Sequence, residues 1–299
     1  MKGLRALPCI LLSIVLLSAC NNADKADKRA QRQEEKQVNK EEKKEVVIPI
    51  NYTSIPVTKQ TVPTIRKDYD SSQMKIILAV NRVDANRWTR LDTLIVPDTF
   101  LTDFMAYSPF PKNVSTIKDV RKMILYSQSI QAFGAYENGE LVRWGPISTG
   151  KKSTPTPSKL YHTNWKSKKT VSTVDDEWVM EWYFNLENFE GVSMHQYEMP
   201  GYPASHACVR LYKEDAMWFY SWCEPWILEK KQVAAYGTPA LVFGEYAFGQ
   251  RKPWRALPEN KDAVKFTEAD LERELKPVLT LVLDRQEKRA KLQAQKIRG

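Results

Sequence analysis

The most informative part of this 299-residue chain is residues 194–211, which read Met194-His195-Gln196-Tyr197-Glu198-Met199-Pro200-Gly201-Tyr202-Pro203-Ala204-Ser205-His206-Ala207-Cys208-Val209-Arg210-Leu211. Two of the chain's three histidines lie here, and Cys208 follows the second of them by two places. A thiol is barely ionised near neutral pH, so acyl transfer by cysteine needs a base to form the thiolate and donors to hold the oxyanion. The spacing predicts a thiol active site. The alternative is a β-hairpin cysteine with two incidental histidines.

This stretch resembles the signature of the L,D-transpeptidases of the peptidoglycan wall, also called the YkuD catalytic domain: a His, a spacer, then Ser/Thr-His-Gly-Cys, an apolar residue and Arg or Asn. The resemblance extends to Ser148-Thr149-Gly150 and Thr154-Pro155-Thr156-Pro157, which look like the family's substrate-side loop. Asp215-Ala216 lies where the family's helix begins. The resemblance implies a mainly β, sandwich-like or barrel-like catalytic domain with one packed helix, over residues 118–248.

The resemblance also implies roles for the residues of the motif. Cys208 corresponds to the nucleophile and His195 to the base that takes its proton. His206 and the backbone amides around Ala207 and Cys208 correspond to groups that hold the active-site loop and the oxyanion. Ser205 is expected to bond locally within that loop.

Three further side chains are candidates for substrate contact. Arg210 carries a planar guanidinium suited to planar anions, so it either braces the loop or meets a substrate carboxylate. The alternative for Arg210 is a surface ion pair. Tyr197 and Tyr202 either form a wall of the groove or simply pack.

The sequence departs from the family at Ala207, where the family has Gly, and at Lys159, where a Gly is expected after the Thr-Pro pair. If the backbone at Ala207 needs a positive φ, the methyl group costs about 1–2 kcal/mol, which a folded core tolerates. If the family's Gly is instead needed to leave room for the oxyanion, the methyl group of Ala207 crowds the site and turnover is in doubt.

By resemblance, the acyl donor is a peptidoglycan tetrapeptide stem, cut between the L-centre of its third residue and D-alanine. The acceptor is another stem, a wall-anchored protein or a free D-amino acid, which implies a part in wall assembly and cell shape. No cofactor or metal is implied. Three alternatives stay open: an L,D-carboxypeptidase or endopeptidase of the same fold, a non-catalytic wall-binding protein, and a thiol redox protein using Cys208 and Cys223. The last is disfavoured because Cys223 falls on an apolar helical stripe.

Short β-branched and aromatic runs predict the strands, and one helix interrupts them. Expected strands are 123–126, 132–136, 141–147, 171–174, 178–184, 192–195 and 240–243, with a hairpin turn at Glu137-Asn138-Gly139-Glu140. The helix is expected from Lys213 to about Ile227. The basic tail, residues 249–299, is expected to be helical from Thr267, with Pro277 breaking or starting a helix.

The N-terminus predicts export. Lys2 and Arg5 precede an apolar run, residues 6–17, which fits a secretory signal and is too short to span a bilayer. Leu17-Ser18-Ala19-Cys20 resembles a bacterial lipobox, which implies removal of residues 1–19, lipid on Cys20, and a membrane-anchored lipoprotein facing the periplasm or wall. The alternative is an uncleaved anchor or a chance cysteine.

Charge and composition describe the region between this signal and the catalytic domain. The formal net charge is +9, but an exported protein does not meet the genome, so nucleic acid is excluded as a partner. Residues 20–72 are predicted to be a charged, disordered tether. Within residues 73–117, the segments 78–82 and 91–97 resemble the second half of a LysM glycan-binding repeat; the alternative is a small subdomain that caps the next domain.

Overall fold

The computed structural model describes residues 48–171 and 178–298. All the elements described below belong to the unit Ile50–Gly299, the second of the two into which the chain divides. The predicted signal, lipobox and most of the predicted tether lie outside the described residues. Within the described ranges, no helix combines the length and the apolar character needed to cross a bilayer.

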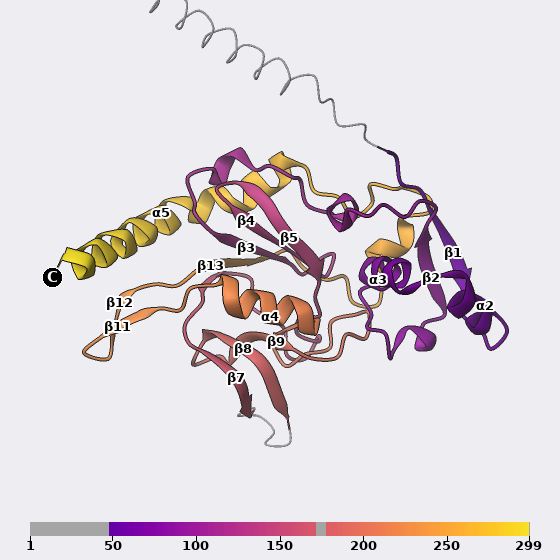
Figure 1. Ribbon diagram of the computed structural model, residues 1–299, viewed down its shortest axis with the longest axis horizontal. Helices are drawn as coiled ribbons and strands as arrows, with labels where there is room; N and C mark the ends of the chain where they lie inside the picture. The colour runs from indigo at the N-terminus through magenta and orange to yellow at the C-terminus, as the bar shows by residue number, and fades with distance from the viewer. Residues whose placement is uncertain (1–47, 172–177, 299) are drawn as a thin grey trace, which may run out of the picture. The chain divides into compact units, whose positions relative to one another are not determined.

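The larger sheet of the second unit has five strands in the order β5-β4-β3-β13-β6 (Figure 1). Their bounds are β3 (Met123–Ser127), β4 (Ala132–Glu137), β5 (Glu140–Pro146), β6 (Leu160–His162) and β13 (Pro239–Phe243). The β3–β13 pair is parallel and the other pairs are antiparallel. Asn138 and Gly139, at φ 49° and 80°, form the turn of the β4–β5 hairpin, which confirms that prediction.

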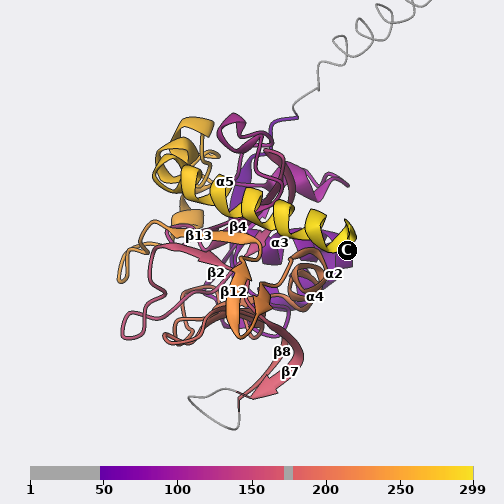
Figure 2. The same ribbon diagram turned by 90° about the vertical axis from the view of Figure 1, so that its left-hand side faces the viewer.

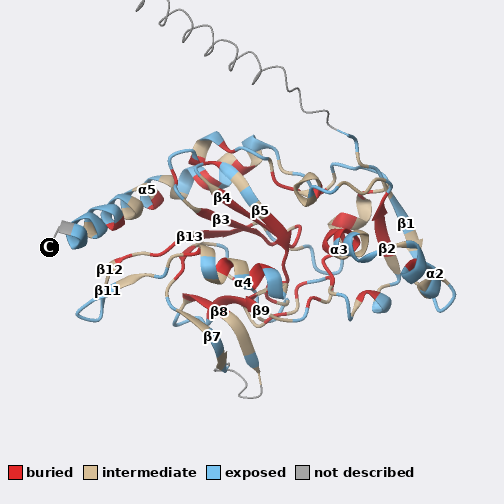
Figure 3. Cartoon of the chain, viewed as in Figure 1, coloured by how far each residue is buried: buried red, intermediate tan, exposed pale blue. Residues whose placement is uncertain are grey.

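The smaller sheet has four strands in the order β10-β9-β8-β7. Their bounds are β7 (Lys166–Val171), β8 (Val179–Glu187), β9 (Val192–Gln196) and β10 (Val209–Leu211). Helix α4 (Lys213–Trp222) packs between the two sheets, and its Phe219 shares one buried cluster with Phe133 of β4 and Phe184 of β8 (Figures 1 and 3). The prediction of a mainly β domain with one packed helix is confirmed. The helix ends before residue 227 because Pro225 disfavours helical backbone at the residue before it.

The N-terminal part of this unit is ordered from its first strand. It contains β1 (Tyr52–Pro56), α2 (Thr61–Asp68), α3 (Ser71–Val80), the short helix η1 (Trp88–Arg90) and β2 (Thr93–Pro97). Strands β1 and β2 pair antiparallel, so the segment that resembles half a LysM repeat is joined to a strand and a helix that precede it. This corrects the expected tether: residues 52–71 fold because Ile65 is buried in a small core with Trp88 and Leu94.

The remaining elements are short helices, one strand pair and the C-terminal helix. They are η2 (Phe104–Tyr107), η3 (Ser115–Ile117), β11 (Ile227–Glu229), β12 (Gln232–Ala235), η4 (Pro253–Ala256) and α5 (Glu268–Arg298). Helix α5 buries Leu271 and Leu275 against the sheet (Figure 2). The expected break at Pro277 is wrong, because α5 runs through it: burial of the apolar residues before and after it outweighs the lost backbone hydrogen bond.

Candidate active site

The site is built where β9 and β10 run parallel. Arg210 lies directly opposite His195 in the register of this pair. Side chains alternate along a strand, and the flanking Met194, Val209 and Leu211 are buried in the core between the sheets, so Arg210 and His195 share the other face. Cys208 immediately precedes β10, and its Sγ lies 3.1 Å from Oγ of Ser193. All four side chains line one pocket.

The imidazole of His195 is fixed in one tautomer. Its Nδ1 lies 2.9 Å from the carbonyl oxygen of Gln196. A carbonyl can only accept, so Nδ1 carries the proton and Nε2 keeps a lone pair. Burial lowers the pKa of His195 to about 4, with the charge of Arg210 acting in the same direction and the Gln196 bond opposing it. The ring is therefore a neutral base at neutral pH, held between the rings of Tyr183 and Tyr197.

The thiol of Cys208 is protonated in this site. Burial raises its pKa above the ordinary value, and the hydrogen bonds from Ser193 and the charge of Arg210 offset this only in part. Sγ donates to the carbonyl oxygen of Gly191 at 3.4 Å. Cys208 and His195 are thus both neutral at rest, and thiolate forms only when the proton moves.

A pH profile of thiol alkylation tests this state. We expect the rate at which iodoacetamide modifies Cys208 to rise about tenfold per pH unit from pH 6 to beyond pH 8, because only the thiolate reacts and its population is small below a raised pKa. Quantifying the modified Cys208 peptide by mass spectrometry measures this rate. A plateau extending down to about pH 5 would instead indicate a preformed thiolate–imidazolium pair and contradict a protonated resting thiol.

A second loop braces the segment that carries Cys208. Ser148 and Arg210 exchange two backbone hydrogen bonds of 3.1 and 3.0 Å, and the Lys151 amide donates to the carbonyl of Ser205 at 2.9 Å. Gly150 lies between these contacts, and a Cβ there would come within 2.2 Å of the Thr154 carbonyl oxygen. The loop predicted from Ser148-Thr149-Gly150 and the following Thr-Pro pair therefore lies against the active-site segment.

Ala207 adopts left-handed backbone, with φ of 71°. Its amide donates to the carbonyl of Thr154 at 3.1 Å, and its carbonyl accepts from Oγ1 of Thr156 at 2.8 Å. The methyl group packs against the core cluster, and Ala207 is not among the described residues that line the pocket. Of the two alternatives for this position, the structure supports a requirement for positive φ. It also corrects one expectation: the Ala207 amide is already used within the fold, which leaves the Cys208 amide as the candidate oxyanion donor of that pair.

One comparison with known proteins covers the region that carries this site. Residues 122–242 match the family model of the L,D-transpeptidase catalytic domain, YkuD. Residues 122–242 are named the YkuD domain after this match. No curated protein matches the chain.

Three solved structures illustrate the likeness. LD transpeptidase LdtMt1 in complex with imipenem is 22% identical (41% of this chain and 59% of that chain covered, TM-score 0.34). An L,D-transpeptidase from Stackebrandtia nassauensis is 20% identical (42% and 57%, TM-score 0.35), and L,D-transpeptidase 1 of Mycobacterium tuberculosis is 25% identical (41% and 62%, TM-score 0.32). The chain spans about three fifths of the length of these structures.

Substitution of Ala207 tests the backbone conformation within the YkuD domain. We expect Ala207→Gly to raise the free energy of unfolding by up to about 1 kcal/mol, because relief of left-handed strain outweighs the greater entropy of the unfolded glycine chain. Ala207→Val should lower it by about 1–3 kcal/mol, since a β-branched residue is poorly suited to positive φ. Urea unfolding measures both values. A glycine variant less stable than wild type by more than about 1 kcal/mol would contradict the assigned conformation.

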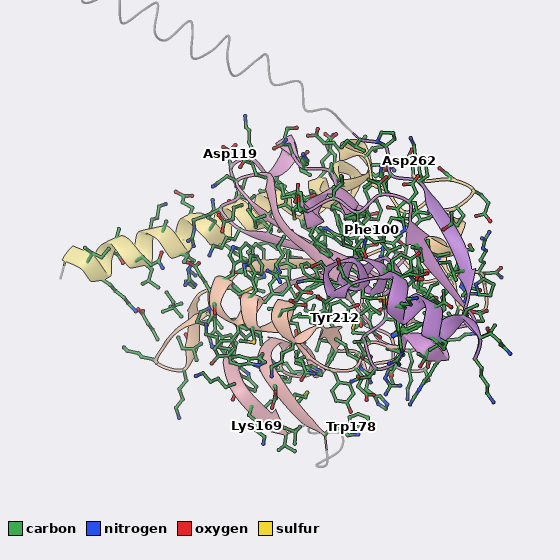
Figure 4. The ribbon with its side chains drawn as sticks, turned by 45° about the vertical axis from the view of Figure 1, so that its right-hand side comes forward. Phe100, Asp119, Lys169, Trp178, Tyr212 and Asp262 are labelled. Atoms are coloured by element: carbon green, nitrogen blue, oxygen red, sulfur yellow. The ribbon has the colours of Figure 1, made fainter. Side chains whose placement is uncertain are left out.

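The remaining predicted residues take different positions in the YkuD domain. His206 lines the pocket, with its Nε2 2.8 Å from Nζ of Lys151 and its ring edge-on to Trp178, at 5.0 Å between ring centroids. Figure 4 shows Trp178 at the end of the β7–β8 hairpin. An ammonium can only donate, so this nitrogen of His206 accepts. Ser205 is buried, and its hydroxyl donates to the carbonyl of Cys208.

Of the two candidate tyrosines, only one lines the pocket. Tyr197 lines the pocket, and the guanidinium of Arg210 lies 4.5 Å from its ring centroid. Tyr202 is half exposed, lies near the ammonium of Lys252, and is not among the described residues lining the pocket. Sequence reasoning missed Ser193. Its position two residues before His195 on a strand was the available signal, because such residues share a face.

The other cysteine of the described ranges, Cys223, is free and buried in the core between the sheets. Burial raises its pKa well above the ordinary thiol range. In the same ranges, no group of three or more His, Cys, Asp or Glu side chains is arranged to hold a metal ion. The geometry of Cys223 is that of a core hydrophobe.

Proposed function

We propose that this protein is a cell-wall L,D-transpeptidase in which Cys208 transfers an acyl group from a peptidoglycan tetrapeptide stem to an amine. The observation that carries the proposal is the β9–β10 register, which places a protonated thiol and a neutral imidazole with a free Nε2 lone pair on one pocket face. Neither group needs to change charge before substrate enters. The pocket thus holds the two partners that thiol acyl transfer requires.

The reaction has two halves. Sγ of Cys208 attacks the carbonyl carbon between the third stem residue and D-alanine, while the thiol proton passes to Nε2 of His195. The imidazolium then gives that proton to the nitrogen of D-alanine, the C–N bond breaks, and a thioester remains. In the second half, an acceptor amine attacks the thioester carbonyl and loses a proton to Nε2 of His195, the C–S bond breaks, and the imidazolium returns that proton to Sγ, which regenerates the thiol.

The surroundings of His195 support these steps. The Gln196 carbonyl stabilises the imidazolium that forms, since its bond raises the pKa of the ring. Burial opposes that charge, so the proton is passed on readily. The Cys208 amide and Arg210 are proposed to stabilise the developing oxyanion or the carboxylate of D-alanine, because an amide N–H donates a hydrogen bond to an anion and a guanidinium adds a positive charge.

The apolar wall of the pocket is proposed to hold the stem peptide. It is formed mainly by side chains of the β7–β8 hairpin and the turn before it, Trp165, Val171, Trp178 and Met180. Aromatic and aliphatic surfaces exclude water from a thioester, which favours an amine acceptor over hydrolysis. This wall is the observation that favours the transpeptidase over the carboxypeptidase.

Release of D-alanine tests the proposal. Full-length protein is incubated with a disaccharide tetrapeptide, with and without a second stem or a free D-amino acid as acceptor. We expect D-alanine release to rise at least several-fold with acceptor and cross-linked or exchanged product to appear. Release independent of acceptor, without cross-linked product, would assign the protein to the L,D-carboxypeptidases, and no release at all would support a wall-binding protein.

We propose further that lipid on Cys20 anchors the protein to a membrane of the cell envelope, where a stem or a wall-anchored protein serves as acceptor. Cys20→Ser should release the protein from the membrane fraction or block its processing, because lipidation needs the thiol. Fractionation of cells that express the full chain measures this. Retention of a processed variant in the membrane fraction would point to a different anchor.

A further inference from the structure

A segment of the N-terminal part lies along the active-site segment. Val83 pairs with Pro200 in an antiparallel bridge, and Asp84 bonds Met199 twice. The amide of Asp84 donates to the carbonyl of Met199 at 2.9 Å, and the amide of Met199 donates to Oδ2 of Asp84 at 2.8 Å. The chain between His195 and Cys208 is therefore held from outside the YkuD domain.

The contact continues toward the reacting groups through Glu198. Its carboxylate pairs with the guanidinium of Arg87, and its carbonyl accepts from Nη1 of Arg210 at 3.3 Å. Arg210 then lies over the ring of Tyr197, and its charge acts on the ionisation of both Cys208 and His195. Glu198 thus connects Arg87 with the cation beside the nucleophile.

The segment of residues 82–87, which contacts the active-site segment, is itself fixed by hydrogen bonds. Arg82 is fully buried at φ 60°, and its Nη1 donates to the carbonyls of Ala79 and Val80 at 2.8 and 2.9 Å. Its Nε donates to Ile130 at 3.1 Å, which fixes the segment to the five-stranded sheet. Tyr212, after β10, donates to the carbonyl of Val83 at 2.6 Å, and Figure 4 shows this tyrosine beside the N-terminal elements.

We infer that Asp84 and Arg87 are positioning residues of the active site, which hold residues 197–202 so that Arg210 stays beside Cys208 and His195. The inference rests on the proposed function for its meaning, but the position of Arg210 can be measured without turnover. Asp84 contributes more than Arg87 to holding residues 197–202, because its carboxylate accepts a charge-assisted, half-buried hydrogen bond from the Met199 amide. The Arg87–Glu198 pair is more exposed and contributes less.

The consequence is electrostatic. The titratable and charged side chains that line the pocket with Cys208 are Tyr183, Glu190, His195, Tyr197, His206 and Arg210. Among them, Arg210 is the cation whose charge lowers the pKa of Cys208 and so favours the thiolate. Withdrawal of one unit charge by a few ångströms in a partly solvated pocket shifts the titration of a thiol by about 0.5 pH unit, a threefold change in thiolate population.

The test compares Asp84→Ala, Asp84→Asn and a matched control, Asp92→Ala, in full-length protein. Asp92 pairs with Arg255 at an exposed place in the same N-terminal part, and among the described residues its carboxylate has no hydrogen bond or ion pair with the 197–202 segment. We expect Asp84→Ala to move the pH midpoint of Cys208 alkylation upward by about 0.5 unit and to slow acylation by a carbapenem about threefold at neutral pH. Asp84→Asn keeps an acceptor for Met199 and should stay near wild type, as should Asp92→Ala.

The outcomes separate the two proposals. A shifted midpoint with no carbapenem acylation in any variant, wild type included, supports positioning and argues against the proposed function. An unshifted midpoint in folded Asp84→Ala overturns positioning even if wild type is acylated. If Asp84→Ala does not fold, Arg87→Ala carries the test at an exposed site: a smaller upward shift, restored by Arg87→Lys, supports the inference, and an unchanged midpoint overturns it.

Discussion

Cys208→Ala is expected to remove acyl transfer completely, with loss of both D-alanine release and carbapenem acylation. Cys208 is the proposed nucleophile, and a serine hydroxyl of the same pocket is a far weaker one than a thiol, so the loss should reach the detection limit. Since Cys208 is only half-buried, the free energy of unfolding should change by less than about 1 kcal/mol. Product analysis together with urea unfolding measures both effects.

Cys223→Ala is the matched control, because it removes the same sulfur atom from the buried core. It should keep activity and lose about 1 kcal/mol or more of stability through the cavity it leaves. Retained activity in Cys208→Ala, or equal stability losses in the two variants, would contradict the assignment of their roles.

His195→Ala is expected to lower kcat/KM for acylation by about 10²–10⁴-fold, the contribution of a general base. The pKa of about 4 adds a prediction on pH: the acidic limb of wild-type kcat/KM should fall near pH 4 rather than near pH 6.5, because His195 becomes protonated only there. Stopped-flow measurement of carbapenem acylation across pH gives both values.

His206→Gln is the control for this histidine. His206 lines the same pocket, but its Nε2 is bonded to Lys151, so we expect less than a tenfold loss. If His206→Gln lowered kcat/KM more than His195→Ala does, His206 and not His195 would be the general base.

The sequence predicted the candidate reacting groups and most of the strands, because both predictions depend on local patterns. Cys208 and His195 are proposed from their spacing, and the Asn138-Gly139 turn was predicted from its residue types. Strand β10 was missed because three residues are too few to show alternation, yet it sets the register of the site. Ser193 and the loop contacts of Ala207 depend on pairing between segments distant along the chain, which a single sequence does not display.

The prediction of a disordered tether over residues 52–71 was wrong for a related reason. These residues carry many polar and charged side chains, and only a few apolar positions, such as Ile65, face inward. Their burial depends on Trp88 and Leu94, which come later in the chain. The contacts of Asp84 and Arg87 with the active-site segment lie beyond any local pattern, because more than a hundred residues separate the partners.

The most direct test of acyl transfer through Cys208 is the mass of the intact protein after reaction with a tetrapeptide donor in the absence of acceptor. We predict a covalent adduct equal to the donor minus D-alanine, mapped to Cys208 as a thioester and released by hydroxylamine. An adduct on any other residue, or no adduct while D-alanine accumulates, would contradict a Cys208 acyl-enzyme.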